Sequence, residues 1–312
     1  MNTNIILKRI NENKVIIIII LLIILLSFLS PVFHTYENIV NVVFEITVEG
    51  IIAIGMTILI LQKNFDLSVG SNLALAATVA ILLQRYGPVV TIIGAILASS
   101  LAGLINGIMV SYLRFNSFVA TLAMMFFLKG LVFYIVNGET VKGITQYYYK
   151  FGYGTLLKIP YPAIVFLVLI TVSGILLSKT KLGRHIYAIG GNPIAAQYFG
   201  INEKAFITSS FVLTGALCGI AGLIIMTRVN IASGALGLYT NIDVIAAVII
   251  GGTLFSGGYG DLFKTFQGIL VLGIIANGMT LLNIQSYLQQ VIKGFLLVLV
   301  IVIDSIVTVR RK

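Results

Sequence analysis

Long apolar stretches separated by short polar breaks recur along the whole chain. Bilayer-spanning helices require stretches of about 18 or more predominantly apolar residues, and most of these stretches reach that length. The pattern therefore predicts an all-α polytopic membrane protein, a helical bundle of about ten transmembrane helices. We expect these helices over residues 15–32, 44–62, 66–84, 90–113, 117–136, 161–178, 207–227, 242–258, 263–283 and 288–308.

Two of the predicted helices resemble each other. The fourth reads "GPVVTIIGAILASSLAGLINGIMV" and the ninth "GDLFKTFQGILVLGIIANGMTL"; with gaps, Asn106 matches Asn277 and, further on, Lys129 matches Lys293. This repeat would relate helices 2–5 to helices 7–10. The shift is an odd number of crossings, so the two halves would have opposite orientations. Inverted repeats of this kind are a transporter architecture.

The third and eighth predicted helices become partners in this repeat, and polar, glycine-containing segments interrupt both. These segments are "NFDLSVGSN" at 64–72 and "GGTLFSGGYGD" at 251–261. Paired interruptions indicate a substrate pathway. The alternative is that they only cap a helix and make a tight turn, and both interpretations remain open. The candidate pathway residues are Asp66, Ser68, Gly70, Asn106, Asn277, Gly257 and Gly258.

A polar segment, "GGNPIAAQYFGI" at 190–201, lies between the sixth and seventh predicted helices. Asn192 is a good N-cap, Pro193 suits the first helical position, and Gly200 suits the left-handed residue that ends a helix. A helix this short is marginal in water, so it should dock against another protein or against this chain's own surface. If it docks an ATPase, the coupling residues are Asn192, Pro193, Ala195, Ala196 and Gly200.

Composition supports a membrane protein, because 59% of the residues are hydrophobic and only 10% are charged. Soluble domains carry about 25% charged residues. The net charge of +10 is explained by Lys and Arg concentrated in cytoplasmic segments, and we expect no nucleic-acid partner. This distribution places both termini in the cytoplasm of a multi-pass protein of the cell membrane, surrounded by lipid. The predicted organisation is a cytoplasmic segment 1–14, one permease domain 15–308 with a coupling loop 179–206, and a basic tail 309–312.

The first apolar run could also be a secretory signal peptide. It covers residues 15–29 and is followed by "SPVFH", which is not an A-x-A cleavage site. We therefore expect the run to be retained as a transmembrane helix.

The chain shows no pattern typical of an enzyme. We find no nucleophile–base constellation, no metal-ligand spacing and a single cysteine, Cys218. The phosphate-binding pattern G-x-x-x-x-G-K-[ST] is absent as well, so ATP would be bound by a separate subunit and this chain would need no cofactor. Lys129 and Lys293 lie in apolar surroundings and would be either structural or ion-coupling residues. Candidate counter-charges are Glu45, Glu49, Asp243 and Asp304.

Several motifs together resemble one family. They are "DLSVGS" at 66–71, "GLINGIMV" at 103–110, "SFVATLAM" at 117–124, "GRHIYAIGGNPIAAQYFGI" at 183–201, "IAAVIIGGTLFSGGYG" at 245–260 and "QQVIKG" at 289–294. With them the chain resembles the membrane subunit of ribose-type ABC importers, in the family of monosaccharide and branched-chain amino acid permeases. One departure is Lys63-Asn64-Phe65, where the family often has glycines before the aspartate.

The resemblance implies ATP-driven import of a monosaccharide such as ribose. It implies three kinds of partner: an ABC ATPase subunit docked at Ala195, Ala196 and Gly200, a second permease copy or paralogue, and an extracytoplasmic substrate-binding protein. Related permeases for nucleosides or furanose-like signalling molecules are an alternative. The residues alone also leave open a secondary transporter driven by an ion gradient, and a channel or membrane scaffold.

Overall fold

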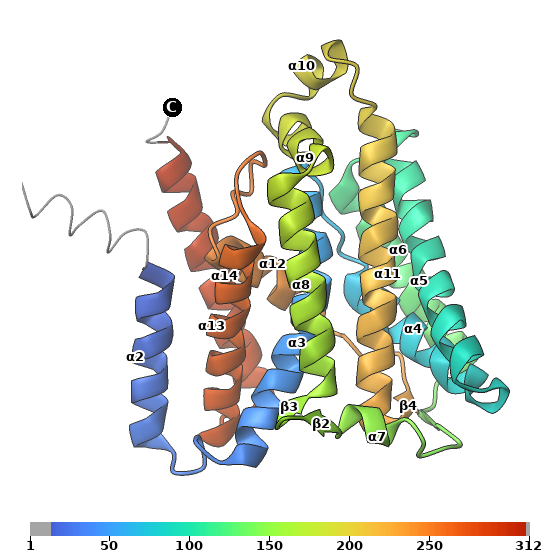
Figure 1. Ribbon diagram of the computed structural model, residues 1–312, viewed down its shortest axis with the longest axis vertical. Coiled ribbons are helices and arrows are strands. Elements are labelled where there is room, and N and C mark those ends of the chain that lie inside the picture. The colour runs from blue at the N-terminus through green and yellow to red at the C-terminus, as the bar shows by residue number, and fades with distance from the viewer. Residues whose placement is uncertain (1–13, 310–312) are drawn as a thin grey trace, which may run out of the picture.

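The computed structural model describes residues 14–309 and is built almost entirely of helices (Figure 1). The ten main helices are α2 (Lys14–Leu29), α3 (Tyr36–Leu61), α4 (Val69–Leu83), α5 (Pro88–Ser111), α6 (Ser117–Ile135), α8 (Tyr161–Lys179), α11 (Glu203–Val229), α12 (Thr240–Ile250), α13 (Leu262–Leu281) and α14 (Ser286–Val309). The remaining elements are η1 (Gln84–Tyr86), α7 (Tyr149–Gly152), α9 (Lys181–Gly191), α10 (Pro193–Tyr198), β1 (Val141–Lys142), β2 (Thr155–Leu156), β3 (Ile159–Pro160) and β4 (Ile231–Ala232).

Each apolar segment predicted from the sequence coincides with one of the ten main helices, so the all-α membrane bundle is confirmed. Within residues 14–309, six helices are both long and apolar enough to cross a membrane: α3, α5, α6, α8, α11 and α13. Shorter apolar helices occur in α2, α12 and α14, and α4 has 15 residues. The bundle therefore combines full crossings with shorter helices.

The centre of the bundle is α3. It packs against α8, α11, α12 and α13, and Ile51, Ile52 and Ile54 are completely buried. A helix that is apolar all round belongs in the interior, which agrees with the sequence of α3. Thr35 begins the helix, because its hydroxyl accepts the N–H of Asn38 at 3.4 Å. Helix α3 is therefore the buried central helix of the bundle.

Contacts between helices repeat in the two halves of the chain. Helix α4 packs against α5 and α6, and α12 packs against α13 and α14. Helix α5 lies on α11, whereas α13 lies on α3, so each half contributes its third helix to the first helix of the other. In Figure 1, α3 runs toward the end of the bundle that carries α10, and α11 runs away from it. An inverted repeat of helices 2–5 and 7–10 predicts this exchange of partners.

The predicted third and eighth helices are both too long. Helix α4 begins at Val69 and not at residue 66, and α12 ends at Ile250 and not at residue 258. After α12 the chain changes direction at Gly252, whose φ of 93° is a conformation that favours glycine. The 11 residues of α12 span about 16 Å, roughly half of the hydrocarbon core of a bilayer. Helix α12 is therefore too short to cross a bilayer by itself.

Candidate functional site

Helix α10 has the caps that the sequence predicts. The side-chain oxygen of Asn192 accepts the N–H of Ala195 at 3.1 Å, and Pro193 is the first helical residue. Gly200 follows with a φ of 76°, and the N–H of Ile201 donates to the carbonyl of Ala196 at 3.1 Å. These bonds satisfy backbone groups at both ends of the helix, so α10 can hold its shape at the tip of the molecule (Figure 1).

The faces of α10 differ from what the motif alone suggests. Ala196 is only 2% exposed, because it packs against the rest of the chain, and Ala195 is half-buried. Beside the polar Asn192 and Gln197, three large apolar side chains are exposed: Ile194 at 67%, Tyr198 at 87% and Phe199 at 86%. A partner protein could therefore contact these three side chains, while Ala196 fixes the position of the helix. We call Ile194, Tyr198 and Phe199 the α10 apolar tip.

Helix α9 connects α10 to the bundle, and the sequence analysis did not predict it. A Cβ at Gly190 would overlap the carbonyl oxygen of Leu61 and lie 2.8 Å from the amide nitrogen of Gly258. The hydroxyl of Tyr187 donates to the carbonyl of Gly260 at 2.7 Å. Burial raises the pKa of Tyr187, and the charge of Asp261 raises it further, so the phenol keeps the proton that it donates. Helix α9 is thus fixed to the end of α3 and to the segment after α12.

A buried polar cluster lies just beyond the end of α3. The carboxylate of Asp66 accepts the N–H of Ser68 at 2.8 Å and its hydroxyl at 2.5 Å. From α5, the amide nitrogen of Asn106 donates to the Ser68 hydroxyl at 2.9 Å and lies 3.4 Å from both Asp66 oxygens. All three residues are completely buried, and the Asn106 side-chain oxygen has no partner. The sequence-predicted residues Asp66, Ser68 and Asn106 therefore form one network.

Gly70 lies where the two halves of the bundle cross. A Cβ at Gly70 would overlap the carbonyl oxygen of Gly237, and a Cβ at Gly237 would lie 2.5 Å from the carbonyl oxygen of Gly70. Residues 62–68 connect α3 to α4, and residues 230–239 connect α11 to α12. The partner of the first interruption in the repeat is thus the segment 230–239, and not 251–261 as the sequence suggests. The two main chains touch because neither position carries a side chain.

The interruption at 251–261 nevertheless lies beside the first one. The rings of Phe65 and Phe255 stack with centroids 4.3 Å apart, and the N–H of Gly258 donates to the carbonyl of Leu61 at 2.9 Å. Gly257 and Gly258 have φ values of 78° and 73°, which supports the tight-turn interpretation of these two residues. Their turn lies against Gly190 and Gly191 of α9.

The departure from the family pattern at Lys63-Asn64-Phe65 coincides with an uncommon backbone conformation. Lys63 has a φ of 61°, in the left-handed region that glycine adopts without strain. The ammonium of Lys63 lies 3.4 Å from the carbonyl oxygen of Gly191. The segment thus keeps a conformation that favours glycine while it carries a side chain that reaches α9.

Asn277 lies far from the Asp66 network. Its amide exchanges two hydrogen bonds with the amide of Asn38, at 2.7 Å and 3.1 Å. Asn38 is in the first turn of α3 and Leu61 is its last residue, roughly 35 Å away at 1.5 Å per residue. The structure therefore separates Asn277 from Asn106, although the two are equivalent in the repeat.

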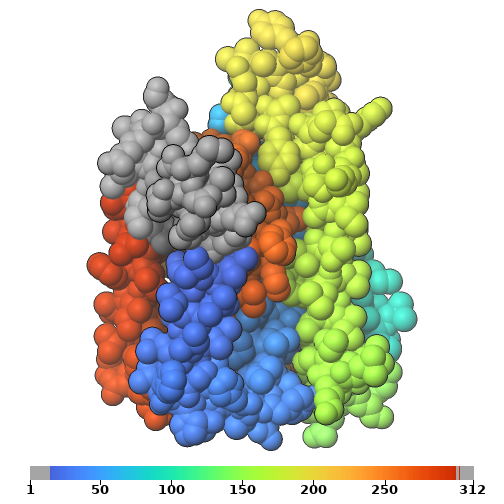
Figure 2. Space-filling model, turned by 60° about the vertical axis from the view of Figure 1, so that its left-hand side comes forward, coloured from blue at the N-terminus to red at the C-terminus, as the bar shows by residue number. Residues whose placement is uncertain are grey.

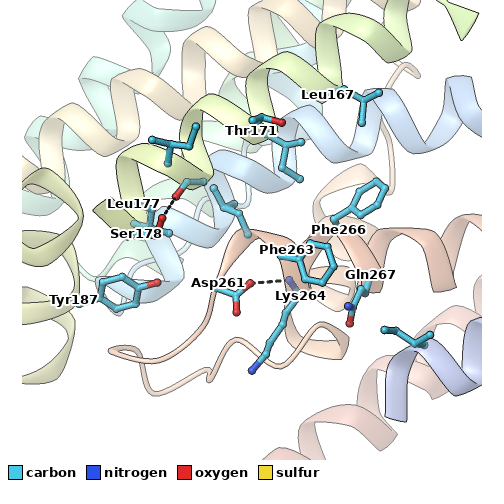
Figure 3. A pocket seen from close by; sticks show the side chains of 15 residues that line it. Leu167, Thr171, Leu177, Ser178, Tyr187, Asp261, Phe263, Lys264, Phe266 and Gln267 are labelled. Atoms are coloured by element: carbon cyan, nitrogen blue, oxygen red, sulfur yellow. Dashed lines mark hydrogen bonds between the residues drawn. The ribbon is translucent and has the colours of Figure 1, made fainter. Parts of the chain in front are cut away.

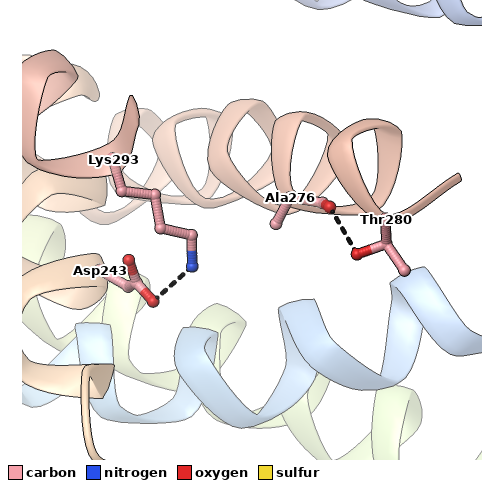
Figure 4. A network of polar contacts seen from close by, with 4 residues as sticks. All are labelled: Asp243, Ala276, Thr280 and Lys293. Carbon is pink, nitrogen blue, oxygen red and sulfur yellow. Dashed lines mark hydrogen bonds and ion pairs between the residues drawn. The ribbon is translucent and has the colours of Figure 1, made fainter. Parts of the chain in front are cut away.

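Charged side chains meet inside the bundle around α12. The ammonium of Lys293 on α14 lies 2.8 Å from the carboxylate of Asp243 on α12 (Figure 4). Glu45 and Glu49 on α3 are near enough for the charge of Lys293 to act on them. In the described part of the chain Lys129 forms no ion pair. The two repeat-related lysines thus have different surroundings. Within residues 14–309, no group of three His, Cys, Asp or Glu side chains could hold a metal ion.

Replacing Lys293 by methionine is expected to lower the stability of the folded protein by about 3 kcal/mol, because it leaves the Asp243 carboxylate unpaired in a largely apolar environment. A second change in the same chain, Asp243→Asn, should recover part of this loss, since it removes the unpaired charge. Thermal unfolding in detergent measures both effects. Lys129→Met is the matched control and should cost less; an equal loss from both lysine variants would contradict the role of the ion pair.

The sequence analysis missed three features of this region. The sequence prediction has a loop where α9 lies, although "KLGRHIYAIGG" has the apolar spacing of an amphipathic helix. The motif does not predict the α10 apolar tip, because Tyr198 and Phe199 fill variable positions of A-A-x-x-x-G and Ile194 precedes the pattern. Asn38 was not considered, and a single polar residue at the start of an apolar helix gives no signal of its distant partner.

Comparison with known proteins gives consistent matches over nearly the whole length. The family described as branched-chain amino acid transport system / permease component matches residues 38–301. The ribose import permease protein RbsC of Escherichia coli (strain K12) is 36% identical over 300 residues, which cover 94% of each chain.

Two other relatives have similar coverage. RbsC of Bacillus subtilis (strain 168) is 36% identical over 89% of this chain and 88% of its own. The L-arabinose ABC transporter permease protein AraH of Azospirillum brasilense is 32% identical over 95% of this chain and 88% of its own. No solved structure matches this chain.

Proposed function

Since this chain belongs to the family of branched-chain amino acid transport system permease components, we propose that it is the permease of an ATP-driven importer for a monosaccharide, with ribose as the first substrate to test. A permease of this kind is a transport subunit and not an enzyme. It works with an ATPase subunit and a substrate-binding protein. ATP is bound by the ATPase and not by this chain.

The observation that carries the sugar assignment is the length of the match. Relatives whose names specify ribose or L-arabinose align with 89–95% of this chain, which supports a sugar as the substrate. Both sugars are pentoses with several hydroxyl groups. Recognition of such hydroxyls requires buried polar groups, and the Asp66 network has one buried acceptor without a partner, the side-chain oxygen of Asn106.

We propose that the ATPase docks on the α10 apolar tip. Three exposed apolar side chains on a capped helix are unusual at an end of the molecule that also carries exposed Lys179, Lys181 and Arg184. Apolar side chains that are fully desolvated on binding supply most of the affinity of a protein interface, and the surrounding charges would form its rim. The concentration of Lys and Arg beside α10 favours a cytoplasmic location, which would place both termini there as well.

A movement of α10 can reach the candidate pathway residues through a chain of direct contacts. Helix α10 follows α9 after one residue, and α9 packs through Gly190 against Leu61 and Gly258. Leu61 ends α3, and the next residues lead into the Asp66 network. We propose that Asp66, Ser68, Gly70 and Asn106 form the gate that moves when the ATPases close. The side chains of Asp66, Ser68 and Asn106 are completely buried, as a closed gate requires. A second permease copy would complete the transporter.

Uptake by proteoliposomes tests the proposal. The permease is reconstituted with its ATPase and binding protein, ATP is enclosed, and radiolabelled ribose is supplied together with the binding protein. We expect uptake that depends on ATP and on all three proteins, with leucine and nucleosides failing to compete. Uptake driven by an ion gradient without ATP would instead show a secondary transporter. Transport of leucine or a nucleoside in place of ribose would overturn the substrate assignment.

A further inference from the structure

An open groove lies on the outer surface of the bundle between α2, α8 and α13. It has a volume of about 750 Å³, and none of the candidate pathway residues line it. Figure 2 shows α2 and α8 as its two walls, with the start of α13 visible between them. Leu167, Ile175 and Phe266 are among the apolar residues that line it. The groove is therefore separate from the proposed gate.

The groove has the length of one bilayer leaflet. It follows α8 from Leu167 to Ser178, about 16 Å at 1.5 Å per residue, which is roughly half of a hydrocarbon core 30 Å thick. Figure 3 shows Ser178 and Tyr187 at one end and Leu167 at the other. The end at Ser178 is the one that leads into α9. A single acyl chain of a lipid in the leaflet on the α10 side matches this depth.

The end of the groove near α9 is polar and has positive charge available. Lys264 lines it from α13, and the exposed Lys179 and Lys181 follow Ser178 at the end of α8 and the start of α9. The ammonium of Lys264 lies 3.4 Å from the hydroxyl of Tyr259 and 5.2 Å from the centre of its ring.

One negative charge, Asp261, also lines this end. Its carboxylate accepts the N–H of Lys264 at 2.8 Å as the cap of α13, so it is held at the helix end. Asp261 offsets Lys264 among the lining residues, so the excess of positive charge at this end comes from the neighbouring exposed Lys179 and Lys181, and this excess favours an anionic ligand over a neutral one.

We propose that this groove binds one anionic phospholipid, with an acyl chain between α8 and α13 and the phosphate near Lys264. The lipid would brace the two helices that hold α9, because α8 continues into α9 and the hydroxyl of Tyr187 bonds to Gly260, next to the start of α13. This inference rests on the position of the chain in a membrane and not on its substrate. Failure of ribose uptake would therefore leave it standing.

The chain contains no tryptophan, so one introduced tryptophan reports on lipid contact without background. Phe266→Trp places the probe in the groove, four residues after Leu262, the first residue of α13. Ile105→Trp is the matched control, because it lies on the exposed face of α5 at a similar distance from the end of its helix. Both full-length variants are placed in nanodiscs that contain increasing fractions of brominated phosphatidylglycerol or brominated phosphatidylcholine.

We expect the tryptophan at position 266 to be quenched by the anionic lipid at about a fivefold lower mole fraction than by the neutral one, as one lysine near a lipid headgroup provides. Lys264→Gln should remove most of this preference and Lys264→Arg should keep it, while the tryptophan at 105 is quenched equally by both lipids. Equal quenching at 266 would show a lipid bound without headgroup preference and would overturn the proposal. Absence of quenching at 266 would show that protein fills the groove, with the same consequence.

Discussion

A permease that carries aspartate at both Tyr198 and Phe199 is expected to lose its ATPase while it stays folded in the membrane. The two side chains are the most exposed part of the α10 apolar tip, so the bundle itself does not depend on them. In a docked complex both positions would be desolvated, and burying an unpaired carboxylate costs several kcal/mol. We expect the affinity for the ATPase to fall about a thousandfold and ATP-driven uptake to fall to background.

Co-purification of the ATPase with tagged permease measures this loss, and gel filtration in detergent confirms that the variant is folded. Leu157→Asp is the control, because Leu157 is 89% exposed in the loop between β2 and β3, at the opposite end of the bundle. Retention of the ATPase by the double aspartate variant would show that α10 does not dock it. Ala196→Glu is a poor test, since Ala196 is buried and a loss of transport would reflect a displaced helix.

The second large effect is expected from adding one methyl group at Gly190. The added carbon would overlap the main chain of Leu61 and press on the amide of Gly258, and neither main-chain group can rotate away. Helix α9 must then shift, which strains the hydrogen bond from Gly258 to Leu61. Overpacking and a weakened hydrogen bond together cost about 3 kcal/mol. We expect Gly190→Ala to lower the unfolding temperature and to reduce uptake at least tenfold.

Gly191 provides the matched control for this prediction. It is the next residue of the same helix, but a Cβ there would have no atom within 4 Å. Gly191→Ala should therefore keep uptake and gain slightly in stability, because alanine favours a helix over glycine by up to about 1 kcal/mol. Thermal unfolding and uptake by the two variants, measured side by side, decide the matter. Equal behaviour would mean that α9 is not tightly packed against Leu61.

The fold was largely predictable from the sequence, because it depends on the local pattern of apolar residues. Ten apolar stretches gave ten helices, and the caps of α10 followed from Asn192, Pro193 and Gly200. The errors occurred where tertiary contacts override the local pattern. The apolar run of α12 continues toward residue 254, but the helix ends at Ile250, where its last turn meets α13 at Gly268.

The candidate site was less predictable, since it depends on contacts between distant parts of the chain. Asp66 and Ser68 come from one motif and Asn106 from another, and the three form one network, whereas Asn277 pairs with Asn38 at the other end of α3. Repeat symmetry relates sequence positions but does not fix their depth or their partners. The contact between Gly70 and Gly237 could not be predicted, because it depends on how the α3–α4 and α11–α12 connections lie relative to each other.

The paths of α2 and α14 have a practical consequence. Helix α2 begins, and α14 ends, at the end of the bundle that carries α10 (Figure 1). Two copies can therefore be joined tail to head by a flexible linker that never has to cross the bilayer. In such a fused pair one copy can carry Gly190→Ala and the other remain unchanged. Uptake by this fused pair then shows whether one unchanged α9 is enough to drive a transport cycle.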